Sequence, residues 1–278
     1  MSENKLLALV VPLLNLCRRA GDVICDHYHA PHAAEYRAKG DNSPLTRADL
    51  DSHHILQTGL NALAPDIPVL SEESSTQEVA QRLSWSRLWL VDPLDGTKEF
   101  LARTGEFTIN IALIDGHAPV LGVLYVPLTR KAYVGIPGCG AWCYEPSEGA
   151  QWAQRAVTTR SLQSGDTLTV LASRRHHGGR LDDCFAWLHH HWGDTRRINS
   201  GSALKFCQMV EGEGDIYPRF SPCSEWDTAA GQALLEAAGG ALLDMAGEPF
   251  QYNARETLLN PDFYAIADAG KPLWRGLF

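Results

Sequence analysis

No two of the seven cysteines form a CxxC pair, and no dense cluster of cysteines occurs. Zinc ribbons carry pairs of cysteines separated by two residues, and small secreted scaffolds carry many cysteines that form disulfides. Neither class of protein is expected. We interpret the thiols as reduced, which predicts a cytoplasmic protein. The chain also contains no internal repeat and no low-complexity tract.

Positive charge is scarce. The chain has 24 Lys and Arg against 33 Asp and Glu, which gives a net charge of −9 at pH 7. DNA and most membrane surfaces are themselves negatively charged, so neither is expected as the main partner. A small anion can still bind where basic groups or cations gather locally.

Long apolar runs are absent as well. The longest candidate, "LLALVVPLLNLC" (Leu6 to Cys17), is shorter than the ~20 residues that span a bilayer. It also lacks the positive leader and the small-residue cleavage site of a signal peptide. The run instead predicts a first helix that faces the core and is broken or kinked near Pro12.

With 278 residues and 45% apolar content, the chain can form one large domain or two moderate ones. Two apolar runs around Asp115 and Gly116 predict a hairpin, and "KAYVGI" predicts the next strand. Residues 145–166 are polar and rich in turn residues, which indicates a surface segment between two halves. Strands and helices then alternate, so we predict a layered α/β (α+β) fold divided into residues 1–150 and 151–278.

The stretch "LWLVDPLDGTKEF" (Leu88 to Phe100) leads from apolar residues into two acids. Its first part predicts a strand buried on both faces that ends at Pro93. Gly96 permits an unusual backbone turn, and a helix is expected to open at Thr97. The unpaired N–H groups of that helix would point toward Asp92 and Asp95.

Other acids follow the same pattern. Glu72 and Glu73 end the short apolar run "PVLS", and Asp227 lies early in the helix predicted from "SEWDTAAG". Neighbouring carboxylates repel each other, and a divalent cation relieves the repulsion. Clusters of oxygen ligands favour magnesium, calcium or manganese. The alternative is that Asp92 and Asp95 are only turn and cap residues.

Taken in order, "SEE", "DPLDGTKEF" and "EWDTAAG" resemble the metal-binding signatures of the inositol monophosphatase superfamily. "GDNSPLTRAD", "ASRRH", "GSALKFC" and "YPRFSPCSEWD" are similar to motifs of its CysQ branch, the 3'(2'),5'-bisphosphate nucleotidases. The resemblance extends from Lys39 to Gly240. It implies a layered αβαβα sandwich and a lithium-sensitive, magnesium-dependent phosphatase of sulfur metabolism that converts 3'-phosphoadenosine 5'-phosphate to AMP and phosphate.

The resemblance also implies a role for each acid. Two or three magnesium ions would be held by the N-terminal half together with one acid of the C-terminal half. Asp49 would polarise Thr97, which orients a metal-activated water, and Glu72 would accept the proton, so no phosphoenzyme is required. From the residues alone, Asp49 could equally be a helix cap. The implied metal ligands are Glu72, Asp92, the carbonyl of Leu94, Asp95 and Asp227.

The C-terminal half would bind the substrate. Lys205 and Arg219 can contact phosphate, and Gly201 and Ser202 are expected at a helix N-terminus. The partner would be a phosphorylated nucleotide bound by a cytoplasmic monomer or homodimer, with a possible peripheral association with the inner membrane. The implied substrate-binding residues are Gly96, Thr97, Ser173, His176, Gly201, Ser202, Lys205, Arg219 and Asp227.

Three alternatives stay open. A haloacid-dehalogenase-type phosphatase needs a DxDxT pattern, whereas Asp92 and Asp95 are three residues apart. An inositol monophosphatase or a fructose-1,6-bisphosphatase would share the metal site and differ in the substrate motifs. A non-catalytic nucleotide sensor would bind without turnover, and measurable phosphate release with magnesium would exclude it.

Overall fold

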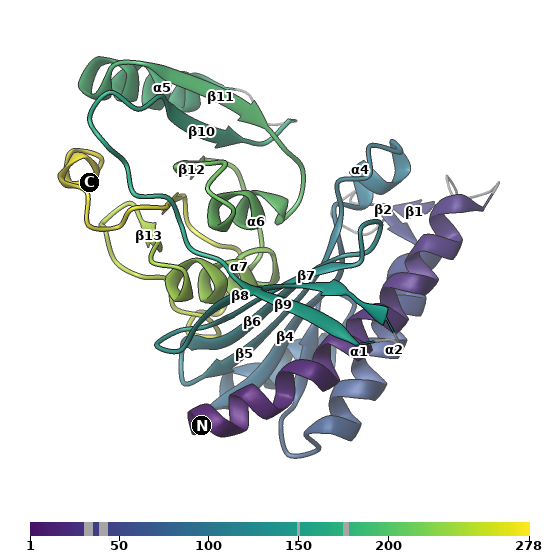
Figure 1. Cartoon of the computed structure of the whole chain (residues 1–278). Helices are drawn as coiled ribbons and strands as arrows, with labels where there is room; N and C mark the ends of the chain where they lie inside the picture. The colour runs from purple at the N-terminus through teal and green to yellow at the C-terminus, as the bar shows by residue number, and fades with distance from the viewer. Residues whose placement is uncertain (31–35, 39–43, 149–150, 175–177) are drawn as a thin grey trace.

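The computed structural model describes the chain except for residues 31–35, 39–43, 149–150 and 175–177. Its elements form successive layers of helices, sheet, helices, sheet and helix (Figure 1). Two sheets carry the architecture: a larger one of seven strands and a smaller one of five. This arrangement confirms the predicted layered α/β sandwich.

The larger sheet has the order β3-β4-β5-β6-β7-β8-β9. Only β3 and β4 pair in parallel; the following pairs are antiparallel, so the strands from β4 onward form a meander. The predicted hairpin is β5–β6, and "KAYVGI" is β7. The strands are β3 (Val69–Ser71), β4 (Arg87–Asp95), β5 (Thr108–Asp115), β6 (Ala118–Val126), β7 (Lys131–Ile136), β8 (Gly140–Pro146) and β9 (Trp152–Ala156).

Helices α1 (Glu3–His29) and α2 (Arg47–Leu63) cover one face of the larger sheet. Leu13 and Leu14 of α1 and Leu56 of α2 pack with apolar side chains of β4 and β5 in one buried cluster. The predicted core-facing first helix is therefore confirmed. Its predicted break is wrong, because α1 continues through Pro12.

The opposite face of the larger sheet is covered by α7 (Glu225–Ala237), with α6 (Leu204–Val210) beside it. Glycines on two neighbouring strands permit this close packing. A Cβ at Gly122 would lie 2.3 Å from the carbonyl oxygen of Ala230, and one at Gly135 would lie 2.3 Å from the Cα of Leu234. The helix backbone therefore rests directly on β6 and β7, and its first turn is fixed relative to the end of β4.

The smaller sheet has the order β11-β10-β12-β14-β13, and α5 (Gly179–Trp192) packs on its outer face. Strand β10 is parallel to β11 and β12, and β14 is antiparallel to both of its neighbours. The strands are β10 (Leu168–Ala172), β11 (Thr195–Asn199), β12 (Ile216–Arg219), β13 (Ala241–Asp244) and β14 (Phe263–Ile266).

Short elements complete the described chain. They are β1 (Tyr36–Ala38), β2 (Pro44–Thr46), α3 (Thr76–Gln81), η1 (Arg82–Ser84), α4 (Thr97–Leu101) and η3 (Pro272–Gly276). Within the described residues, no helix combines the length and the apolar character needed to cross a bilayer.

Two sequence expectations need comment. The strand predicted to end at Pro93 instead continues to Asp95, because Pro93 lies in a bulge where the register shifts and no ladder donor is required. The division after residue 150 stays a prediction. Strand β9, which follows that position, pairs with β8 and so belongs to the larger sheet.

Candidate active site

The bulge in β4 brings two acids to the same side of the sheet. In a regular strand, residues three apart point to opposite faces. Asp92 pairs with Asn110 and Asp95 with Thr108, so two residues of β4 face a single residue of β5 between these pairs. The extra residue turns Asp95 to the side of Asp92. The Leu94 N–H donates to Asp92 Oδ1 at 3.0 Å and fixes the buried carboxylate.

A third acid arrives from a distant part of the chain. Asp227 lies in the first turn of α7, where its Oδ2 accepts the Ser224 N–H at 2.8 Å in a capping box. One carboxylate oxygen each of Asp92, Asp95 and Asp227 lies within 4.8 Å of the others. The cap orients the Asp227 side chain, and the packing of α7 on the sheet sets its position.

Glu72 faces the same cluster. Its N–H donates to the Val91 carbonyl at 3.0 Å, which places it beside the end of β4. Burial, then the charges of Glu72, Asp95 and Asp227, raise the pKa of Asp92 well above its ordinary value. Burial, then Asp95 and Glu72, raise the pKa of Asp227 to about 7. The carboxylates therefore repel each other, and the all-oxygen donor set suits a hard divalent cation.

Asp95 is held on its other side by the loop before α6. Its Oδ2 accepts the Ala203 N–H at 2.6 Å, the Ser202 hydroxyl at 3.0 Å and the Asn110 amide at 3.4 Å. Helix α6 begins only at Leu204, so Ser202 lies in the preceding turn with φ 53° and not at the helix N-terminus as predicted. That turn therefore holds the Asp95 carboxylate in place by hydrogen bonds.

Lys205 is 1% exposed and closes the same turn. Its Nζ donates to the carbonyls of Ser200 at 3.1 Å and Ser202 at 2.7 Å, and it lies 4.8 Å from the centre of the Tyr217 ring. Burial, then the charge of Arg219, lower its pKa to about 8. Lys205 thus holds this turn together through hydrogen bonds and also places a positive charge at the site.

Asp49 and Thr97 meet as the sequence predicts. The Thr97 hydroxyl lies 3.2 Å from Asp49 Oδ1 and 3.3 Å from the Leu94 carbonyl. Asp49 is also the capping-box acid of α2, and its Oδ2 accepts the Thr46 N–H at 2.8 Å. The cap and the Thr97 contact use different oxygens, so the two interpretations of Asp49 are compatible.

Gly96 supplies the turn between Asp95 and α4. Its φ is 95°, and a Cβ there would lie 2.8 Å from the Glu106 carbonyl oxygen. Both facts favour glycine.

A cavity of about 130 Å³ adjoins these acids. It brings together most of the predicted substrate residues, while His176 lies outside the described residues. The cavity is also lined by residues that no sequence motif indicated: Lys98, Glu99, Tyr217, Cys223 and Thr228. In the sequence, only the closeness of these residues to the predicted motifs could have indicated them. The predicted residues in the lining are Asp95, Gly96, Ser173, Gly201, Ser202, Lys205, Arg219 and Asp227.

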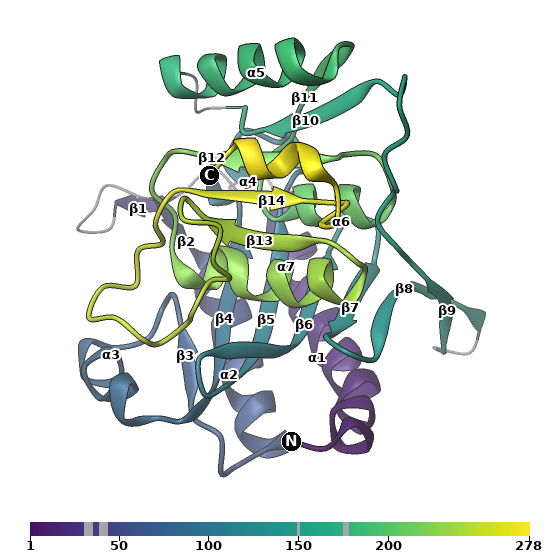
Figure 2. The ribbon, with the colours of Figure 1, turned by 90° about the vertical axis from the view of Figure 1, so that its left-hand side faces the viewer.

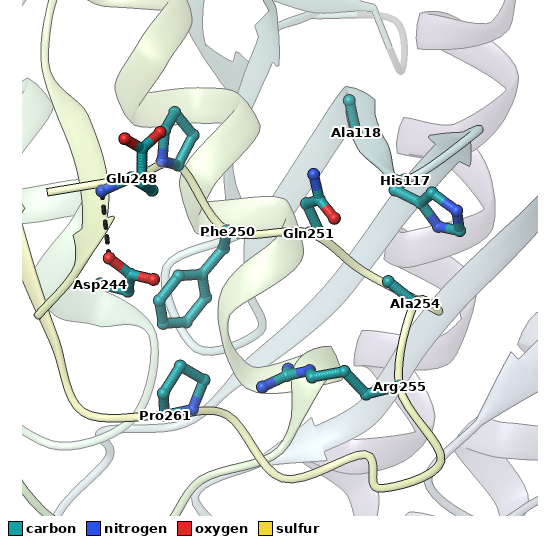
Figure 3. A pocket seen from close by; sticks show the side chains of 10 residues that line it. His117, Ala118, Asp244, Glu248, Phe250, Gln251, Ala254, Arg255 and Pro261 are labelled. Atoms are coloured by element: carbon teal, nitrogen blue, oxygen red, sulfur yellow. Dashed lines mark hydrogen bonds between the residues drawn. The ribbon is translucent and has the colours of Figure 1, made fainter. Parts of the chain in front are cut away.

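A larger hollow of about 570 Å³ lies elsewhere, between the turn after β5 and the segment that follows β13 (Figure 3). His117 and Arg255 line it, together with Asp244, Glu248 and the ring of Phe250. His117 follows the end of β5 opposite to Thr108, whereas the acids of β4 lie beside Thr108 and Asn110. Its described lining includes none of the predicted site residues.

Comparison with known proteins agrees with the geometry. Residues 8–270 match the model of the family described as "Inositol monophosphatase family". The chain belongs to the inositol monophosphatase family. This confirms the resemblance drawn from the motifs.

Within this family, the chain is 43% identical to the 3'(2'),5'-bisphosphate nucleotidase CysQ of Shigella flexneri, over 89% of this chain and 95% of the relative. It is 34% identical to the protein of that name from Haemophilus influenzae, over 86% of each chain. The crystal structure of CysQ from Bacteroides thetaiotaomicron superposes with a TM-score of 0.81 and 37% identity, covering 94% of this chain and 97% of that one.

An inositol monophosphatase from Anabaena superposes with a TM-score of 0.71 at 22% identity, covering 99% of this chain and 96% of that one, and shows the shared fold.

Proposed function

We propose that the protein is a 3'(2'),5'-bisphosphate nucleotidase that hydrolyses 3'-phosphoadenosine 5'-phosphate to AMP and phosphate with Mg²⁺. The name of the CysQ relative that is 43% identical over 89% of the chain supports the reaction. The observation that carries the proposal is the convergence of Asp92, Asp95 and Asp227 beside a cavity lined with cationic side chains.

The acids would hold two or three Mg²⁺ ions through Glu72, Asp92, Asp95, Asp227 and the Leu94 carbonyl. When bound, such ions neutralise charge on the phosphoryl group and on the leaving oxygen. No side chain needs to form a covalent intermediate. The chain's own residues would therefore bind the substrate, orient the attacking water and take up its proton.

Asp49 and Thr97 would orient the attacking water. The Thr97 hydroxyl has two acceptors within reach, Asp49 Oδ1 and the Leu94 carbonyl, so its single proton is donated to one of them. The hydroxyl oxygen is then left as an acceptor for a water O–H, which turns a lone pair of that water away from Thr97. Glu72, beside the end of β4, would take the proton that the water loses.

Arg219 and Lys205 would bind the second phosphate of the substrate. The Arg219 guanidinium is fixed by the carbonyls of Ser221 at 3.1 Å and Pro222 at 3.0 Å and lies 3.2 Å from the Tyr217 hydroxyl. Lys205 lines the same cavity, so the two side chains present positive charge beside the acids. This polarity suits a nucleotide with two phosphate groups, with Ser173 and His176 proposed near the nucleoside.

A substrate panel tests the proposal. Phosphate release should be compared for 3'-phosphoadenosine 5'-phosphate, inositol 1-phosphate and fructose 1,6-bisphosphate, with Mg²⁺, with added Li⁺ and with a chelator. We expect the bisphosphate nucleotide to have the highest kcat/KM, with inhibition by Li⁺ and no release with the chelator. A preference for inositol 1-phosphate or fructose 1,6-bisphosphate would contradict the substrate assignment. No release from any of them would favour the sensor.

The cytoplasmic location, a peripheral contact with the inner membrane, and a monomeric or homodimeric state stay predictions of the sequence.

A further inference from the structure

Residues 252–260, here called the strap, lie against the first turn of α7. The Glu225 N–H donates to the Leu258 carbonyl at 2.8 Å, and the Asn260 side chain donates to the Ser224 carbonyl at 2.7 Å. A bridge between Ser224 and Leu259 adds a further backbone contact. Figure 2 shows the segment between β13 and β14 descending toward α3. The strap therefore supports the turn that carries Asp227.

Glu225 fastens α7 to the strap through a carboxylate that has no solvent exposure. Its Oε2 accepts the Asn253 N–H at 2.8 Å, and its Oε1 lies 3.4 Å from a guanidinium nitrogen of Arg255. A buried carboxylate is costly unless it is hydrogen-bonded and compensated by positive charge. Glu225 is two residues from Asp227, so movement of the strap would be transmitted to this acid.

Arg82 holds the strap from the other side. This side chain is 1% exposed, and arginine is seldom fully buried unless it is paired. It donates to Asn253 Oδ1 at 2.9 Å and to the carbonyls of Arg255 at 2.7 Å and Glu256 at 2.6 Å. Asn253 in turn donates to the Arg82 carbonyl at 2.7 Å. The planar guanidinium thus fixes three positions of the strap at once.

The network joins the two segments that bring acids to the site from outside β4. Arg82 lies in η1, ten residues after Glu72, and α3 lies between them. Glu225 lies beside Asp227. Among the described residues that line the substrate cavity, neither Arg82 nor Glu225 nor Asn253 occurs. Their contacts are therefore with the scaffold of the site.

We propose that Arg82, Asn253 and Glu225 are positioning residues that hold Asp227 in register with the acids of β4 for metal binding. Four carboxylates that converge repel one another, so a site that binds a cation tightly needs a scaffold that keeps them close before the ion arrives. The strap and its arginine supply that scaffold. The inference deepens the proposed function and rests on its metal site.

Asn253→Gly and Glu225→Gln test the inference. Asn253 has φ 54°, which glycine adopts freely, and the glycine variant keeps the N–H that Glu225 accepts while losing the side chain that Arg82 binds. Glu225→Gln keeps an acceptor oxygen and removes the charge. Mn²⁺ binding is measured by electron paramagnetic resonance. Both variants should bind Mn²⁺ about 10-fold more weakly, the scale reported for groups that orient metal ligands. Near-normal kcat is expected at saturating metal.

Arg160→Gln is the matched control. It breaks the Arg160–Asp215 pair, in which Nε lies 2.9 Å from one carboxylate oxygen and the acid has no exposure. Asp215 immediately precedes β12, at the end of that strand opposite to Arg219. The control should lower the melting temperature and leave Mn²⁺ affinity at the wild-type value. The inference is overturned if Asn253→Gly and Glu225→Gln lose stability like Arg160→Gln and still bind Mn²⁺ as tightly as the wild type.

Two further outcomes separate the inference from the proposed function. If the two variants lose Mn²⁺ affinity and the wild type releases no phosphate from 3'-phosphoadenosine 5'-phosphate, the inference stands and the substrate assignment fails. If the wild type binds no Mn²⁺, the inference fails together with the metal site.

Discussion

Replacing Asp227 with asparagine should stabilise the metal-free protein and at the same time abolish turnover. Burial and the charges of Asp95 and Glu72 raise the pKa of Asp227 from 3.8 to about 7. At pH 8 the folded state must therefore hold a carboxylate that it disfavours. Asparagine has a similar shape and keeps an oxygen that can accept the Ser224 N–H, so the cap of α7 should survive.

The size of the effect follows from the pKa. A difference of about three between folded and unfolded states corresponds to about 4 kcal/mol, which is an upper bound because Asp227 is partly exposed. We expect about 1–3 kcal/mol, or roughly 2–10 °C in melting temperature. Because the pKa of Asp227 is higher in the folded state than in the unfolded state, protonation favours folding. This stabilisation is fully present below the unfolded pKa and is lost as the pH rises toward about 7. The advantage of Asp227→Asn should therefore be small near pH 4 and complete at pH 8.

Thermal unfolding with a chelator at pH 4.5 and pH 8, repeated with Mg²⁺, measures both effects. The wild type should gain stability with Mg²⁺ and the variant should not, while kcat falls by about 1000-fold or more. The reasoning is refuted if metal-free Asp227→Asn is less stable than the wild type at pH 8. It is also refuted if Mg²⁺ stabilises the two proteins equally.

Three further predictions concern single side chains. Asp95→Asn should abolish turnover by weakening Mg²⁺ binding while the fold is kept; wild-type rates at ordinary Mg²⁺ would remove Asp95 from the site. Arg219→Ala should reduce kcat/KM for 3'-phosphoadenosine 5'-phosphate more than for inositol 1-phosphate, and equal losses would argue against a specificity role. Thr97→Val should lower kcat by roughly 100-fold with the Mg²⁺ requirement unchanged, because only the water-orienting hydroxyl is lost. A normal kcat would exclude that role, and Asp49→Asn combined with Thr97→Val should be non-additive.

The local signals in the sequence were sufficient for the elements that carry strong periodicity. The buried strand at Leu88 to Val91, the hairpin around Gly116 and the helix with Asp227 in its first turn all appear as predicted. Their patterns depend on neighbouring residues, which a single sequence displays. The acids were also recognisable, because each follows a strand or opens a helix.

Features that depend on distant contacts escaped prediction. Strand β9 has mostly exposed residues and β11 reads "TRRIN", so neither carries the apolar pattern of a strand. Pro93 indicated the end of a strand, whereas β5 allows β4 to continue through a bulge. The bond from Arg82 to Asn253 joins residues 171 positions apart, and no local signal connects them. The acids could be named from the sequence, and the scaffold that holds them could not.

An anomalous-scattering map from crystals soaked with Mn²⁺ tests the metal site most directly. The account predicts at least one peak among the carboxylate oxygens of Glu72, Asp92, Asp95 and Asp227, and the loss of that peak in Asp227→Asn. The predicted metal site would be contradicted if crystals of the active protein showed Mn²⁺ elsewhere and no density among these four acids.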